Sequence, residues 1–122
     1  MPSAVLALRG ATTVDEDSPE QIRSRTVALL DAMMGANGVA HDDLISVIFT
    51  ATDDIHSLFP ALAGRESGLS DVPLICAREL AIAGSTPRCI RVMMHLTTEL
   101  SRSELHHVYL EGARTLRDDL PD

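Results

Sequence analysis

The sequence predicts an α+β fold of α/β-like character, in which one long and two short helices accompany a mixed sheet of about five strands. Short apolar runs rich in β-branched residues recur along the chain, which is typical of strands. One long segment has apolar residues at helical spacing, and turn signals separate the other segments. The 122 residues suffice for a single domain spanning 1–122 with one modest core.

The expected strands are short segments with apolar residues on one or both faces. They cover residues 4–9, 44–51, 72–77, 89–97 and 108–116. A single long helix covers about one face of such a sheet, whereas strands that are apolar on both faces need a second cover. Another copy of the chain is the simplest source of that cover, so we expect an obligate homo-oligomer.

The long helix is predicted to begin after Ser18. This side chain can cap the first turn, Pro19 suits the first helical position, and Gln21 completes a capping box. The apolar stripe of the helix consists of Ile22, Thr26, Leu29, Leu30 and Met33. The helix is expected to end at Asn37, because a glycine follows it.

The two remaining helices are expected to be short. One is predicted over residues 57–66, with Gly68 ending it. The other is predicted to follow a second capping box at 101–104 and to have one or two turns.

Composition and charge exclude several classes of function. The net charge is −8, all ten basic residues are arginine, and aromatic residues make up 2% of the chain. Such a chain is not expected to bind nucleic acid or an anionic membrane surface. A few arginines in a cleft can nevertheless bind a small anion. The two cysteines form no disulfide framework, and neither a signal peptide nor a membrane span is visible, so we expect a cytoplasmic protein.

Two arginines stand out as candidates for binding an anion. Alternation along the strand at 89–97 places Arg91 on the same face as Cys89 and Met93, where an unpaired charge is costly. Arg9 lies at the end of the first strand, beside a glycine. A guanidinium group binds a carboxylate through two parallel hydrogen bonds. From the residues alone, structural salt bridges and an anion pocket both remain open for these arginines.

Other chemistries have little support in the sequence. The histidine and aspartate groups at 41–43, 53–56 and 106–107 lack metal-ligand spacing, so we expect no metal. Cys76 has no histidine base at a telling spacing, and an inert thiol is the favoured interpretation. No phosphate-binding loop, dinucleotide fingerprint or nucleophile elbow is present, and we expect no cofactor. The residues thus indicate an oligomer with a candidate anion site and no visible nucleophile.

Several motifs in order resemble one known family. They are LRGATTV at 8–14, TATD at 50–53, FPA at 59–61, VPLIC at 72–76, Glu79, RCIRVMM at 88–94, HVYLE at 107–111 and LR at 116–117. Together they are similar to the monofunctional AroH-class chorismate mutases along nearly the whole chain. The resemblance implies a homotrimer shaped as a pseudo-α/β barrel, with active sites in clefts between adjacent subunits. It also implies an isomerase, an intramolecular transferase that converts chorismate to prephenate in phenylalanine and tyrosine biosynthesis.

The resemblance also assigns roles to residues of this chain. Arg91 would donate to the ether oxygen of chorismate and to a carboxylate, while Arg9 and Tyr109 would hold carboxylate oxygens. Glu79 would accept from the ring hydroxyl and face the partial positive charge of the transition state, and Cys76 would contact the same region. The expected substrate-binding residues are Phe59, Ala61 and Leu74 in the apolar wall, Ile75 at the rim, and Arg65, Leu116 and Arg117 at the entrance.

Two questions remain open at this stage. Strict strand alternation places Cys76 and Glu79 on opposite faces, so either the strand ends near Ala77 or the two residues serve different clefts. The alternative function is a non-catalytic trimeric module that binds a small dicarboxylate. The chemistry itself favours catalysis, because a pericyclic rearrangement needs conformational restraint and charge stabilisation but no nucleophile, metal or proton relay.

Overall fold

The computed structural model of the protein describes residues 3–116 and contains one five-stranded sheet. Its strands are β1 (Ala4–Thr13), β2 (Leu44–Ala51), β3 (Leu74–Arg78), β4 (Cys89–Thr98) and β5 (Val108–Tyr109). Its helices are α1 (Pro19–Asn37) and α2 (Pro60–Gly64). Short turns of other helical types occur at His41–Asp43, Arg65–Leu69, Arg102–Glu104 and Glu111–Thr115.

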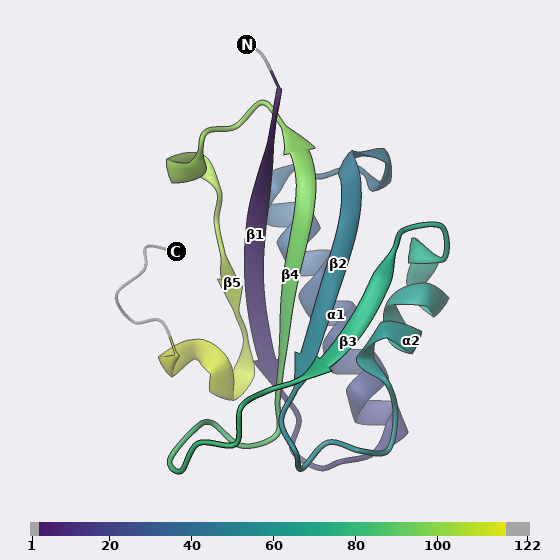
Figure 1. The fold of residues 1–122 in the computed structure, drawn as a ribbon, viewed down its shortest axis with the longest axis vertical. Helices are drawn as coiled ribbons and strands as arrows, with labels where there is room; N and C mark the ends of the chain where they lie inside the picture. The colour runs from purple at the N-terminus through teal and green to yellow at the C-terminus, as the bar shows by residue number, and fades with distance from the viewer. Residues whose placement is uncertain (1–2, 117–122) are drawn as a thin grey trace.

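The sheet is mixed, as the sequence predicts. Its strand order is β3-β2-β4-β1-β5. The central strand β4 pairs antiparallel with both β2 and β1, whereas β3 and β5 lie parallel to their neighbours at the two edges (Figure 1). The strands come from distant parts of the chain, so residues far apart in sequence are placed side by side.

Helix α1 begins and ends where its local signals predict. The Ser18 hydroxyl accepts the backbone N–H of Gln21 at 3.3 Å, and Pro19 is the first helical residue. Gly38 follows the helix with φ 60°, a left-handed conformation that glycine adopts without strain. The buried residues of the helix include the whole predicted stripe, namely Ile22, Thr26, Leu29, Leu30 and Met33.

Helix α1 lies behind the sheet in Figure 1, and α2 packs against α1 beside β3 at the edge of the sheet. The main core lies between the two layers and includes Leu8, Leu29, Met33, Val47, Phe49, Val92 and Met94. The opposite face, called the open face below, carries alternate side chains such as Arg9, Ile48 and Arg91. No helix of residues 3–116 covers the centre of this open face (Figure 1). The expected exposure of one face in the single chain is therefore observed.

The predicted fifth strand, 108–116, is wrong beyond its first two residues. Strand β5 ends at Tyr109, and a single-turn helix follows at Glu111–Thr115. Glu111 has φ 53°, which turns the chain away from the extended direction. The N–H of Gly112 then donates to the Thr13 hydroxyl at 2.9 Å, which fixes the turn against the end of β1.

Smaller corrections concern the segments around α2. The predicted helix 57–66 begins only at Pro60, because the Asp17 carboxylate accepts the backbone N–H groups of His56 and Ser57 and holds this segment in a bend. The predicted strand 72–77 is displaced to Leu74–Arg78, and its first residues include Pro73, which has no N–H to donate. Within residues 3–116, none of the helices combines the length and apolar character that a membrane span requires.

Candidate active site

A cleft of about 310 Å³ on the open face brings together four of the five predicted catalytic residues. We call it the cationic cleft. Its lining consists of Arg9, Gly10, Ala11, Ile48, Thr50, Glu79, Arg91, Val92, Met93 and Tyr109. Cys76 is the predicted catalytic residue that does not line it.

Strand register explains why these residues meet. Arg91 on β4 pairs with Thr50 on β2 and with Ala11 on β1, and Ala11 pairs in turn with Tyr109 on β5. These four residues form one row across adjacent strands. Arg9 lies two residues before Ala11, so its side chain projects from the same face of the sheet.

The Arg91 guanidinium is oriented by a carboxylate of the same cleft. Its Nε lies 3.6 Å from Oε2 of Glu79, and the two side chains are 48% and 25% exposed. Glu79 also accepts a hydrogen bond from the Thr50 hydroxyl. Its backbone N–H donates to the Ala51 carbonyl at 3.0 Å, which continues the β3 pairing by one residue. Since a guanidinium has five N–H donors, the contact through Nε leaves others for a ligand.

The start of β4 is clamped to the end of β2. The N–H of Cys89 donates to the Thr52 hydroxyl at 3.0 Å, and the N–H of Thr52 donates to the Cys89 carbonyl at 3.1 Å. The Asp54 carboxylate accepts the N–H of Arg88 at 2.9 Å. Burial raises the pKa of Asp54, but hydrogen bonds from Thr52 and Arg88 outweigh burial and hold that pKa below its usual value. The clamp fixes Arg91, which lies two residues further along.

Cys89 lies beside Arg91 and is 1% exposed. Burial raises the pKa of the Cys89 thiol, although the charge and hydrogen bonding of Arg91 oppose that increase. The thiol is therefore protonated at neutral pH and is a packing group rather than a nucleophile.

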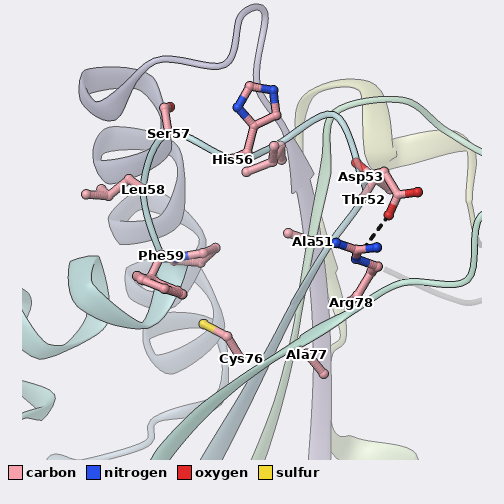
Figure 2. A pocket seen from close by; sticks show the side chains of 12 residues that line it. Ala51, Thr52, Asp53, His56, Ser57, Leu58, Phe59, Cys76, Ala77 and Arg78 are labelled. Atoms are coloured by element: carbon pink, nitrogen blue, oxygen red, sulfur yellow. Dashed lines mark ion pairs between the residues drawn. The ribbon is translucent and has the colours of Figure 1, made fainter.

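A second cleft, of about 440 Å³, lies at the edge of the sheet beside β3, and we call it the edge cleft. Its lining includes Phe59, which is 72% exposed, and Cys76. Figure 2 shows the Cys76 sulfur pointing toward the Phe59 side of this cleft. At the other side, Nε of Arg78 lies 3.4 Å from the Asp53 carboxylate (Figure 2). Burial raises the pKa of the Cys76 thiol, so this thiol also stays protonated.

The two clefts resolve the question of Cys76 and Glu79. Strand β3 ends at Arg78, with Cys76 on the side of Phe59 and the helices, while Glu79 reaches the open face beside Arg91. The clefts share no lining residue. The strand thus ends one residue after Ala77, and in the single chain the two residues also line different clefts.

The remaining predicted binding residues are distributed around these clefts. Ala61 is buried in α2, and Leu74 is half-buried against the main core. Arg65 is exposed at the end of α2, and Ile75 is 59% exposed. Leu116 packs with the cluster of Ala11, Cys89 and Ala113 beside the cationic cleft. Arg117 lies outside the described residues.

Six lining residues of the cationic cleft were not assigned to the site by the sequence reasoning: Gly10, Ala11, Ile48, Thr50, Val92 and Met93. Alternation along β4 places Met93 on the face of Arg91, so this residue could have been found. Thr50 could not, because its contact with Glu79 depends on the pairing of β2 with β4 and β3. Within residues 3–116 no group of three or more His, Cys, Asp or Glu side chains is placed to hold a metal ion.

Comparison with known proteins identifies the family. The chorismate mutase type I family matches residues 5–120. The chain is 47% identical over 117 residues to a chorismate mutase AroH of Thermus thermophilus, with 95% of this chain and 96% of the relative covered. It is 40% identical over 117 residues to a chorismate mutase AroH of Bacillus subtilis (strain 168), with 95% and 92% covered.

A solved structure agrees with these matches. The chorismate mutase from Clostridium thermocellum superposes with a TM-score of 0.87 at 44% identity, over 89% of this chain and 97% of that one. Fold and sequence therefore lead to the same assignment. The chain therefore belongs to the chorismate mutase type I family, as an enzyme of the AroH class.

Proposed function

We propose that this chorismate mutase converts chorismate to prephenate in composite sites, in which the cationic cleft of one chain faces the edge cleft of a neighbouring copy. The observation that carries this proposal is the separation of the predicted site residues. Arg9, Glu79, Arg91 and Tyr109 line one cleft of the chain, whereas Phe59 and Cys76 line another. A second copy would bring the two sets together around one substrate.

Exposed apolar side chains support such an assembly. Phe59 and Ile75 lie at the edge-cleft side of the chain and are 72% and 59% exposed. Leu80 and Ile82 are 80% and 64% exposed on the connection from β3 to β4, which extends beyond the sheet at the bottom of Figure 1. Burying these groups against a copy would remove apolar surface from water. A closed homotrimer, which the AroH-class resemblance implies, satisfies this requirement with identical interfaces.

Charge also favours a composite site. Chorismate is a dianion, while the described lining of the cationic cleft holds two arginines and one glutamate, a formal charge of +1. One negative charge of the substrate would thus lack a partner. We propose that Arg65, near the edge cleft, or Arg117 supplies the second positive charge at the entrance.

The proposed mechanism uses position and charge. Arg9 and Tyr109 hold the carboxylates, which keeps the flexible substrate in its reactive chair-like conformer. Arg91 donates to the ether oxygen, which gains negative charge as the C–O bond lengthens. Glu79 accepts from the ring hydroxyl and faces the positive charge that develops on the ring. Phe59, Ala61 and Leu74 supply an apolar wall, and Cys76 contacts the substrate as a neutral thiol.

The remaining assignments follow from the same reasoning. We propose that one catalytic domain spans residues 1–122, which the single sheet and the family match over 5–120 support. We also propose a cytoplasmic location, which the two free cysteines favour. The alternative of a non-catalytic dicarboxylate-binding module is not favoured, because the family and its relatives are chorismate mutases.

Complementation between inactive variants tests the composite site. Arg91→Ala disables the cationic cleft, and Cys76→Asp places a carboxylate in the edge cleft where it repels the substrate. Each variant alone should accelerate the loss of chorismate absorbance very little. Co-expression of the two should restore roughly a quarter of wild-type activity, since each mixed trimer then contains one intact site.

The matched control combines Arg91→Ala with Glu79→Ala, two changes in the same cleft. Every subunit of a mixed trimer of this pair carries a change in its cationic cleft, so no site is intact. Activity should therefore stay low if both residues are needed in one site. Sedimentation of the wild type should give a trimer. A monomer with full activity, or no recovery from the first pair in verified mixed trimers, would contradict the proposal.

A further inference from the structure

His107 makes a contact that the proposed mechanism does not use. Its Nδ1 accepts the backbone N–H of Arg9 at 3.0 Å. The parallel pairing of β1 with β5 starts one residue later, with Gly10 opposite Val108 and Ala11 opposite Tyr109. The imidazole therefore supplies, at the end of the ladder, the acceptor that a backbone carbonyl supplies elsewhere in a sheet.

This geometry fixes the protonation of the ring. A backbone N–H can only donate, so Nδ1 must carry a lone pair and no proton. The contact therefore depends on an acceptor at the Nδ1 position of the His107 side chain.

The backbone of Arg9 pairs with Met93 of β4 on one side, and on the β5 side its N–H is bound by His107. No hydrogen bond or ion pair within residues 3–116 engages its guanidinium, and its one side-chain partner on the backbone is His107. Arg9 also borders a second hollow, of about 460 Å³, whose lining includes His95, Arg102 and His107. The long side chain thus has space on two sides, and only one side is the cationic cleft.

The segment that carries His107 is itself held firmly. Asn37, at the end of α1, accepts the N–H of His106 at 2.7 Å and donates to its carbonyl at 2.9 Å. The same amide nitrogen donates to the Met33 carbonyl at 2.8 Å, and Asn37 is 8% exposed. The end of α1 is therefore connected through His106 and His107 to the strand residue that projects into the cleft.

We propose that His107 is a positioning residue for substrate binding, which fixes the backbone of Arg9 beside Tyr109 so that both can hold carboxylate oxygens of the substrate. This inference rests on the proposed role of Arg9 as a carboxylate anchor. It assigns to His107 a function in the cleft without contact between its imidazole and the substrate.

Two substitutions of similar size distinguish the effect of losing the acceptor from the effect of losing the bulk of the ring. His107→Asn keeps an acceptor on the γ-substituent, close to the position of Nδ1, whereas His107→Leu keeps the branch and removes the acceptor. A carboxylate contact exists in both the bound substrate and the transition state, so its loss raises KM more than it lowers kcat. We expect His107→Leu to raise KM for chorismate about tenfold with kcat nearly unchanged, and His107→Asn to restore most of that loss.

His107→Gln serves as the control if His107→Leu fails to fold. Its acceptor lies one atom further out, near the position of Nε2, so KM should be raised as for His107→Leu while thermal stability stays near that of His107→Asn. Equal KM values for the Asn and Gln variants, or a wild-type KM in His107→Leu, would overturn the positioning role.

Measurements in an Arg9→Ala enzyme distinguish the positioning role of His107 from the anchor role of Arg9. If His107 acts through Arg9, His107→Leu should raise KM no further in an Arg9→Ala enzyme. A full additional rise in that background would overturn the positioning role and leave the anchor role intact. A normal KM for Arg9→Ala alone would instead overturn the anchor role of Arg9, and with it the basis of this inference.

Discussion

Arg91 illustrates how a single charged side chain is oriented within the cationic cleft. It is half-exposed on the central strand, and its Nε lies 3.6 Å from Oε2 of Glu79. The sequence left a structural salt bridge and an anion pocket open for this arginine. Arg91 has a carboxylate partner, and it also lines the cationic cleft. Because Glu79 is also bound by the Thr50 hydroxyl, the pair is oriented before substrate arrives.

The first prediction concerns this guanidinium. Arg91→Ala should lose at least about 3 kcal/mol of transition-state stabilisation, comparable to the loss of an oxyanion donor. Arg91→Lys should also be strongly impaired, because a point charge does not reproduce the two-pronged geometry. Steady-state kinetics on chorismate measures both effects, mainly as a fall in kcat. Near-normal turnover in Arg91→Ala would remove Arg91 from its assigned role.

A second prediction concerns pH and His41, away from the clefts. Its Nε2 lies 2.7 Å from the Asp71 carboxylate, and this hydrogen bond, with that of Asp42, raises the pKa of His41 above 6.5. A raised pKa means that this pair contributes to stability fully below pH 6.5, and the contribution is lost as pH rises through the folded-state value. In an NMR titration His41 should lose its proton above pH 6.5, and Asp71→Asn should shift that titration downward. An unchanged titration in Asp71→Asn would contradict this origin.

At the scale of elements, the close packing of β1 against α1 determines how the cationic cleft is supported. Gly10 lies between Arg9 and Ala11 and faces α1, where a Cβ atom would be 2.4 Å from Sδ of Met33. Only glycine allows the helix to approach the strand so closely at this point. The glycine of the RGATT motif therefore has a packing role, directly behind two residues of the cleft.

The third prediction compares two glycines. Gly10→Ala should destabilise the fold by about 1–3 kcal/mol, because Met33 and Leu29 must move to admit the methyl group. Gly35→Ala, in α1, meets no atom within 4 Å and should stabilise by about 0.4–1 kcal/mol. Chemical denaturation measures both changes. Effects of the same sign would show that contact with Met33 does not decide the outcome at Gly10.

Element boundaries were predictable where a local signal exists. Ser18 and Pro19 fix the start of α1, and strand β2 covers the predicted 44–51. The end of β5 was not predictable, because the left-handed turn at Glu111 is held by Thr13, which is distant in sequence. A pattern read along the chain contains no information on such a contact.

At the scale of the whole molecule, the two clefts divide the proposed site between copies. The cationic cleft lies on the open face, and the edge cleft lies beside β3 at one side of the sheet. In the proposed assembly, a single chain would contribute half of a site in each place. Under the proposed arrangement catalysis would depend on assembly, because Arg91 and Phe59 line different clefts of one chain.

The fourth prediction concerns residues 117–122, which lie outside the described residues. By resemblance, Arg117 contributes to the entrance, so deletion of 117–122 should raise KM more than it lowers kcat. The main core, with Leu8, Phe49 and Met94, is built from described residues, and thermal unfolding should change little. Kinetics together with gel filtration tests this. Loss of the oligomer on truncation would make the segment an assembly element instead.

The sequence by itself determined the mixed α+β class, the long helix with its caps, and the residues most able to bind an anion. These features depend on local capping, on strand alternation and on a set of motifs in order. Tertiary structure decided that Arg9, Arg91, Glu79 and Tyr109 share one cleft and that Cys76 lies in another. It also placed His107 against the backbone of Arg9. Strand order and register set such contacts between distant residues, and no periodicity along the chain specifies them.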